Sequence, residues 1–336
     1  MATNTTNTML KPLNKQQQSL LLSMVPVEMI LTITDQTTAS AADAVSLALT
    51  CKALFLILSE RSIKRLDTNS KQMLLINLER DISWVVYCPV ARTLLPFSSK
   101  GNNFPLASTR ELYFTEPAIS YSIYEGADRN INFLTTRLVR NHRLYGPTHG
   151  IPLRNLTLTG IHFSSSIFMQ IPCRVFLETS RRAKWIDQDL IVSSTWIVHV
   201  VGIELVGRVI SPESLRRFLL DMHISDACRH CTFEGGLNYS YGALNSSFNQ
   251  AGARLSQNMA YEDLGSCCIC ETDWDVSISW AKRGLVFKLT RYHDLGCCSI
   301  PPDPKWLCLV ERDWTKAMRS PRETCYGCVR SKWIDM

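Results

Sequence analysis

The feature of this sequence that most constrains its fold is the segment from Leu20 to Leu58, in which a polar loop joins two short apolar helical patterns. Pro26 suits the first position of a helix, where its missing N–H costs nothing, and apolar residues follow it at helical spacing. Ser40, with Asp43 three places on, is an N-cap pattern for the second helix. The second helix is apolar on two faces, and so short a segment cannot bury both. It therefore needs the remainder of its own chain or a partner protein.

Two stretches of this segment carry a family resemblance: Val25-Pro26-Val27-Glu28-Met29-Ile30 and Leu49-Thr50-Cys51-Lys52-Ala53-Leu54-Phe55. They resemble the F-box, a helical hairpin that docks a protein onto the Skp-type adaptor of cullin ubiquitin ligases. The polar run over 34–38 departs from the family, which continues its first helix with apolar residues. The resemblance implies a helix-in-groove interface. The residues expected to bind the adaptor are Val25, Pro26, Met29, Ile30, Leu47, Leu49, Cys51 and Phe55.

Two other interpretations of the segment stay open. It can be the core of an ordinary helical domain, or, with Lys11 and Lys15 before it, it can imitate a secretory signal. Pro26 and Glu28 lie inside the apolar run and argue against a signal, because a charge there is costly to insert.

Composition sets the broad class. The chain has 336 residues, 46% of them hydrophobic and 20% charged, which is typical of a globular protein with one large and one small domain. Without an apolar stretch of membrane-spanning length, we expect no membrane partner. The net charge of +6 is spread along the chain, so we expect no nucleic-acid partner. Thirteen cysteines, several in C-x-x-C pairs, favour metal over disulfides and predict an intracellular protein, in the cytoplasm or nucleus.

The predicted fold class is α+β, in three parts. Residues 1–18 are expected to be a disordered tail, 19–66 a helical F-box domain, and 67–336 a mixed α+β body that recruits a substrate. Within the body, the patterns predict the following elements: a helix over 70–86, a helix or strand over 137–145, a strand over 195–203, a helix over 212–222 and a strand pair over 276–280 and 284–292.

The cysteine pairs Cys228-Arg-His-Cys231 and Cys267-Cys-Ile-Cys270 carry the main chemical signal. Two residues between cysteines let both thiolates reach one ion, and two such turns complete a tetrahedral zinc site. The predicted metal ligands are Cys228, Cys231, Cys267 and Cys270, with His230 and Cys268 as adjacent alternatives. Reduced, half-buried thiols and a redox pair are the competing interpretations. Bound zinc would be structural, because four protein ligands leave no open position.

Further motifs extend the resemblance almost to the C-terminus. They include Leu75-Ile-Asn-Leu-Glu-Arg-Asp81, the segment from Cys267 to Asp273, and Arg291-Tyr-His-Asp-Leu-Gly296. In this order they are similar to a class of F-box proteins common in filamentous fungi. Ala91 and Leu95 stand where that class has a cysteine and a histidine, so Cys88 has lost its companions.

The resemblance implies a substrate receptor that binds the adaptor, through it a cullin, and an unknown protein substrate. The chain lacks G-x-S-x-G, P-loop and G-x-G-x-x-G motifs, and we expect no enzymatic activity. The alternative is a stand-alone, zinc-stabilised protein-interaction domain with the N-terminal hairpin buried in its own core.

Overall fold

The computed structural model has an α+β fold. It describes residues 26–29, 32, 41–49, 54, 66–97, 118–119, 131–168, 171–201, 211–222, 224, 227–228, 230–231, 250–255, 257, 259–282, 284–300, 302–310 and 326–335. The helices are α3 (Ala41–Ala48), α5 (Thr68–Asp81), α7 (Phe133–Tyr145), the 3-10 helix η1 (Leu153–Leu156), α8 (Pro212–Asp221), α10 (Pro304–Val310) and α12 (Cys328–Ile334). The strands are β1 (Val85–Cys88), β2 (Thr93–Pro96), β3 (Ala118–Ile119), β4 (Ile131–Asn132), β5 (Leu158–Phe168), β6 (Ile171–Ile186), β7 (Asp189–Val201), β8 (Tyr261–Ser266), β9 (Thr272–Ala281) and β10 (Gly284–Asp294).

The chain divides into two compact units, Met1–Ile82 and Ser83–Met336. In the first unit α3 packs against α5 through Ala42, Val45 and Leu74, which form a small apolar cluster. Asp67 caps α5, because its carboxylate accepts a hydrogen bond from the backbone N–H of Ser70 at 2.7 Å. The sequence placed the domain boundary between residues 66 and 67, but the first unit extends to Ile82 because α5 belongs with α3. The predicted tail over 1–18 lies outside the described residues.

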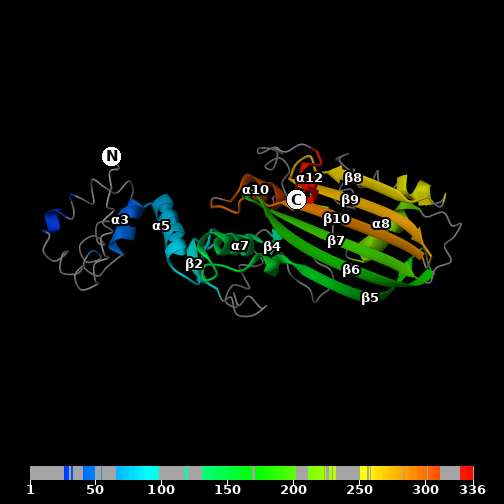
Figure 1. The fold of residues 1–336 in the computed structure, drawn as a ribbon, viewed down its shortest axis with the longest axis horizontal. Helices are drawn as coiled ribbons and strands as arrows, with labels where there is room; N and C mark the ends of the chain where they lie inside the picture. The colour runs from blue at the N-terminus through cyan, green and yellow to red at the C-terminus, as the bar shows by residue number, and fades with distance from the viewer. Residues whose placement is uncertain are drawn as a thin grey trace, which may run out of the picture. The chain divides into compact units, whose positions relative to one another are not determined.

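A six-stranded antiparallel sheet dominates the second unit, with the strand order β5-β6-β7-β10-β9-β8 (Figure 1). Two runs of consecutive hairpins, β5 to β7 and β8 to β10, join where β7 pairs with β10. The Arg291 guanidinium lies 3.8 Å from the Trp196 ring centroid across this central pair. The two halves of the sheet therefore meet along the β7–β10 ladder, which pairs eleven positions.

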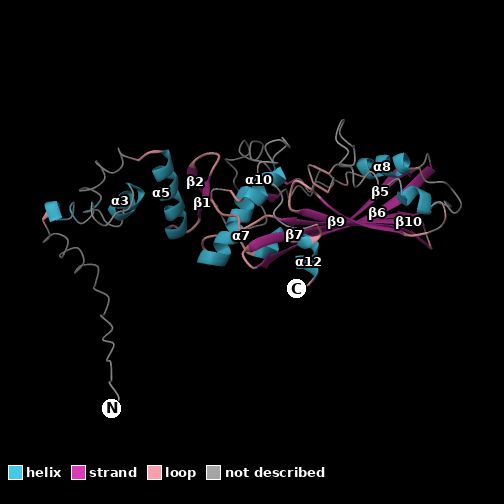
Figure 2. Ribbon diagram, turned by 90° about the horizontal axis from the view of Figure 1, so that it is seen from above, coloured by secondary structure: helices cyan, strands magenta, loops and turns pink. Residues whose placement is uncertain are grey.

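The two faces of the sheet carry different elements, and Figure 2 shows α8 on one side and α12 on the other. On the first face, Phe218 of α8 contacts Phe168 at 4.9 Å between ring centroids, inside the main apolar core. On the second face, Val329 of α12 packs on Tyr292 and Ile191. Strand residues alternate between these faces because successive side chains of a strand point to opposite sides. Helix α8 thus covers part of one face near β5, and α12 covers part of the other face at β9 and β10.

The observed elements agree with most of the patterns in the sequence. Helix 212–222, the strand pair and the strand over 195–203 correspond to α8, β9 with β10, and the second half of β7. The ambiguous segment 137–145 is the end of α7, whose N-cap Asn132 accepts from the Thr135 N–H at 2.8 Å. Among the described residues, no helix combines the length and the apolar character needed to cross a membrane.

Candidate metal centre

The turn that joins β8 to β9 presents two buried thiols. Cys267 and Cys270 are fully buried, and the backbone closes the turn with a bond from the Cys267 N–H to the Thr272 carbonyl at 2.8 Å. The N–H groups of Ile269 and Cys270 both point at the Cys267 sulfur, each at 3.4 Å. Two backbone donors aimed at one sulfur favour its thiolate form, because they stabilise the negative charge.

A second short turn faces the first one. It follows α8, and Cys228 and Cys231 form an isolated antiparallel bridge in which the Cys231 N–H donates to the Cys228 carbonyl at 3.2 Å. Both thiols are buried, and between them lies half-buried His230, whose Nδ1 is 3.9 Å from the Cys228 sulfur.

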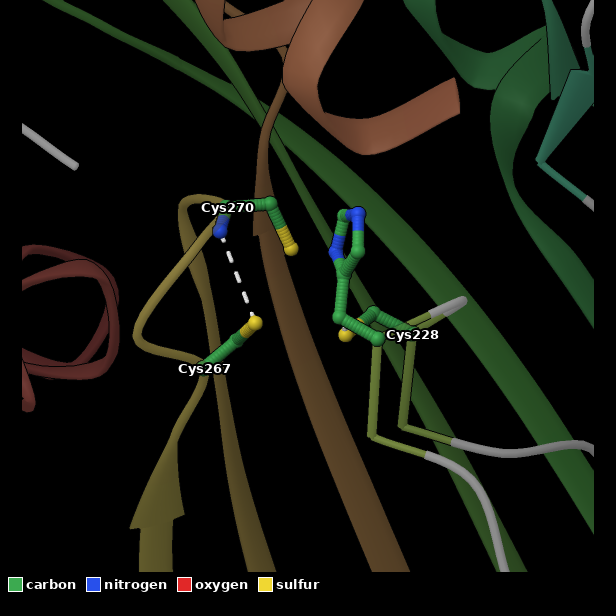
Figure 3. Close-up of side chains that lie close together, drawn as sticks. Cys228, Cys267 and Cys270 are labelled. Carbon is green, nitrogen blue, oxygen red and sulfur yellow. Dashed lines mark hydrogen bonds between the residues drawn. The ribbon is translucent and has the colours of Figure 1, made fainter. Parts of the chain in front are cut away.

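The two turns bring four potential ligands together. The ligand atoms of Cys228, His230, Cys267 and Cys270 all lie within 4.8 Å of one another. Figure 3 shows the three cysteine sulfurs converging on the same space, with the bond from the Cys270 N–H to the Cys267 sulfur. Three of the four predicted ligands therefore come together. His230 completes the group, and Cys231 lies outside it, although the nearby sulfurs of Cys228 and Cys267 raise the pKa of its thiol. The other alternative, Cys268, is exposed.

The charges of the four groups are strongly linked. The thiols of Cys228, Cys231 and Cys270 donate to the Cys267 sulfur and lower its pKa. Burial, together with this donation, raises the pKa of Cys270 well above its ordinary value. Burial lowers the pKa of His230, but the adjacent sulfurs of Cys228 and Cys267 outweigh burial and raise it to about 10. The buried sulfurs thus favour a positive charge beside them, which the protonated imidazole of His230 supplies and which a metal ion would supply in place of its proton.

No family model, no curated protein and no solved structure matches this chain.

The donor set fits a metal ion. Three thiols and an imidazole are soft or borderline donors, and a tetrahedral zinc site places neighbouring donor atoms about 3.5–3.8 Å apart, given its metal–ligand bond lengths. The 3.9 Å separation of Cys228 Sγ and His230 Nδ1 is close to that value.

Further buried residues lie in β8 and β9, the strands that the Cys267–Cys270 turn connects. Trp274 lies opposite Gly265 in the β8–β9 ladder, and a Cβ on Gly265 would meet its indole ring at 2.2 Å, so only glycine fits there. Thr272 follows the turn and contacts both Cys270 and His293, a pair of contacts that the sequence analysis did not anticipate. The motif quoted for the resemblance already contained Thr272, but its spacing gave no indication of its partner 21 residues later.

The expected adaptor-binding residues lie in the first unit. Among the described ones, Pro26, Met29 and Leu49 are exposed, Met29 by 55% and Leu49 by 46%. Leu47 is half-buried in α3. Four expected residues lie outside the described part of the chain: Val25, Ile30, Cys51 and Phe55.

Proposed function

We propose that Cys228, His230, Cys267 and Cys270 hold one structural zinc ion. The convergence of three thiols and one imidazole within 4.8 Å carries this proposal. With four protein donors the coordination of zinc is complete, which leaves no position for a substrate and favours a structural role.

The ion would join two parts of the chain that are distant in sequence. One pair of donors follows α8, and the other pair occupies the β8–β9 turn. Because α8 packs on the buried face of the sheet, the metal would fix the segment that leaves this helix against the edge hairpin. Its binding free energy would then add to the stability of the fold.

The metal content of the full-length chain, purified without chelators, tests this proposal. We expect one zinc per chain, lost in Cys267→Ser and Cys270→Ser. Cys268→Ser is the matched control, since Cys268 is exposed in the same turn. Comparison of His230→Ala with Cys231→Ser identifies the fourth ligand, and we expect the greater loss for His230→Ala. A folded wild-type chain without stoichiometric metal contradicts the proposal.

We further propose that the chain is the substrate-receptor subunit of a Skp-cullin-F-box ubiquitin ligase. The carrying observation is that apolar residues of the F-box-like stretches stay exposed, although the first unit has its own apolar cluster. Ala42 and Val45 fill that cluster, whereas Leu49, one turn further along, does not. Exposed Met29 and Leu49 are suitable anchors for a partner's groove.

In this proposal the first unit binds the adaptor, and through it the cullin, while the second unit presents a surface to an unknown protein substrate. No covalent chemistry is asked of the chain, since the ligase supplies the ubiquitin transfer. The zinc ion would keep the second unit rigid enough to present that surface.

A pull-down with purified Skp-type adaptor tests the receptor function. We expect capture of the wild type and loss of capture in a Pro26→Ala/Leu49→Asp variant. Met73→Asp is the matched control, because Met73 is an equally exposed apolar residue of the same unit, 52% exposed, outside the F-box-like stretches. Loss in both variants would indicate general destabilisation of the unit.

The second candidate is a stand-alone, zinc-stabilised interaction domain. The packing of α3 on α5 favours it, since this packing already buries one apolar face of α3 within the unit. Failure of the wild-type chain to bind any adaptor, together with intact zinc binding, would select this candidate.

A further inference from the structure

Three buried residues, Cys270, Thr272 and His293, form a chain of side-chain contacts that begins at the candidate metal centre. The Thr272 hydroxyl lies 3.2 Å from the Cys270 sulfur and 2.9 Å from Nδ1 of His293. Cys270, Thr272 and His293 are all buried, with exposed fractions of 0%, 0% and 1%. Thr272 and His293 are directly opposite one another in the β9–β10 ladder, so the sheet itself holds this contact in place.

The direction of the two hydrogen bonds follows from the chemistry of the groups. A metal-bound Cys270 is a thiolate, which can only accept, so the Thr272 hydroxyl must donate to it. The hydroxyl has a single proton, and its oxygen then accepts from Nδ1–H of His293. Burial, followed by the nearby Arg291 guanidinium, holds the pKa of His293 well below its ordinary value. The imidazole is therefore neutral and carries a single N–H.

We propose that Thr272 and His293 are positioning residues of the metal centre, which orient the Cys270 thiolate through the relay His293 Nδ1–H to Thr272 Oγ1–H to Cys270 Sγ. This inference rests on the zinc centre proposed above. The relay withdraws charge from one of the metal-binding sulfurs and fixes its rotamer. Outer hydrogen-bond partners of this kind change metal affinity by about 10- to 100-fold when they are removed.

The opposing interpretation is that Thr272 is only a β-branched residue that fills space in a strand. Thr272→Val separates the two, because valine keeps the shape and the branching and removes the hydroxyl. Thr272→Ser restores the hydroxyl with less bulk. Thr290→Val is the matched control, since Thr290 is a buried threonine of β10 whose hydroxyl lies 3.1 Å from that of Thr195, away from the candidate ligands.

The experiment uses the full-length chain loaded with Co(II), whose sulfur-to-metal charge-transfer absorption reports directly on the thiolates. We expect Thr272→Val to bind Co(II) about 10- to 100-fold more weakly and to shift the absorption to lower energy, because the sulfur has lost a hydrogen-bond donor. We expect Thr272→Ser to retain the absorption of the wild type, and Thr290→Val to leave both quantities unchanged. Equal affinity and equal absorption in Thr272→Val would overturn the relay.

A second measurement needs no substitution. The relay requires the proton of His293 on Nδ1, and the nitrogen chemical shifts of its imidazole in the metal-loaded wild type report the tautomer. A proton on Nε2 alone would overturn the proposal even if Thr272→Val failed to fold. Absence of the charge-transfer absorption in the wild type would instead refute the zinc centre itself, so the two failures are distinguishable.

Discussion

Asp273 offers a sharp test of how the C-terminal helix is held. Its carboxylate is fully buried, accepts from the Ser266 hydroxyl at 2.5 Å and from the backbone N–H of Arg330 at 2.9 Å. The Ser266 oxygen in turn accepts from the Gly327 N–H at 2.9 Å. One carboxylate thus connects the sheet to the first turn of α12. We predict that Asp273→Ala releases this helix.

The magnitude follows from the bonds that are lost. A hydrogen bond to a charged group contributes about 1.5–3 kcal/mol, so the two bonds from Ser266 and Arg330 to Asp273 together contribute about 3–6 kcal/mol. Some of this is recovered when the freed Arg330 N–H and Ser266 hydroxyl reach water, because the detached helix leaves its site open. We expect a loss of about 3–4 kcal/mol in the free energy of unfolding of the second unit.

Urea denaturation measures the free energy, and hydrogen exchange measures the local effect. We expect the amides over 327–335 to lose protection in Asp273→Ala before the remainder of the sheet does. Glu262→Ala is the control, since Glu262 is exposed on the same β8–β9 hairpin and should change stability by less than about 0.5 kcal/mol. Unchanged protection of α12, or a loss below about 1 kcal/mol, would refute the assigned role of Asp273.

Three further predictions concern the metal, the core and a buried charge. Zinc affinity, measured with a chromophoric chelator, should fall as the pH is lowered, because thiols such as Cys270, whose pKa is raised, must lose their protons to bind metal; pH-independent affinity would argue against thiolate ligands. Phe218→Ala should destabilise the second unit by about 3–5 kcal/mol in urea denaturation, and Phe163→Ala, at an 80% exposed site, by less than about 1 kcal/mol. Lys305→Met removes the ammonium 2.9 Å from the buried carboxylate of Asp294 and should cost about 3–5 kcal/mol near neutral pH. Burial, then the nearby Asp189, already raises the pKa of Asp294, so its folded form binds the proton more tightly than the unfolded chain does. The loss in Lys305→Met should therefore shrink as the pH falls towards and below that pKa, and a constant loss would contradict this assignment.

Helices and strands whose sequence signals lie within a few neighbouring residues could be predicted from the sequence. Ser211 precedes Pro212, and in the structure its hydroxyl accepts from the Ser214 N–H at 3.1 Å, as expected of a helix cap. The β-branched run around residue 197 and the apolar alternation of β10 likewise indicated strands. These signals are contained within a few residues, so the sequence alone is sufficient for them.

Strands β5 and β6 could not be predicted from such local signals. β5 contains a glycine and three serines, and β6 contains five charged residues, a composition that gives little local preference for a strand. Their structure depends on pairing along eleven positions with one another, followed by pairing of β6 with β7. A strand of this kind is defined by its neighbours in the sheet, which a local pattern does not contain.

The candidate metal ligands could likewise be predicted only in part from the sequence. The spacing of the two cysteine pairs predicted the meeting of Cys228, Cys267 and Cys270, since each turn can present thiols on one side. The choice between His230 and Cys231 depends on the backbone path of a four-residue turn and on what it faces. Spacing leaves both choices open, and only the position of the opposite turn favours His230 as the group within 4.8 Å.

Thr272 and Asp273, the residues that follow the second cysteine pair, each make a contact that depends on the register of β9. Consecutive residues of a strand point to opposite faces of a sheet, so one of them faces the cysteine cluster and the other faces α12. Ser266 and His293, their partners on the neighbouring strands, complete both contacts. A shift of β9 by a single residue would exchange the two faces and break both contacts at once. The cysteine cluster and the attachment of the C-terminal helix therefore depend on the same register, and a metal ion that fixed the β8–β9 turn would stabilise both.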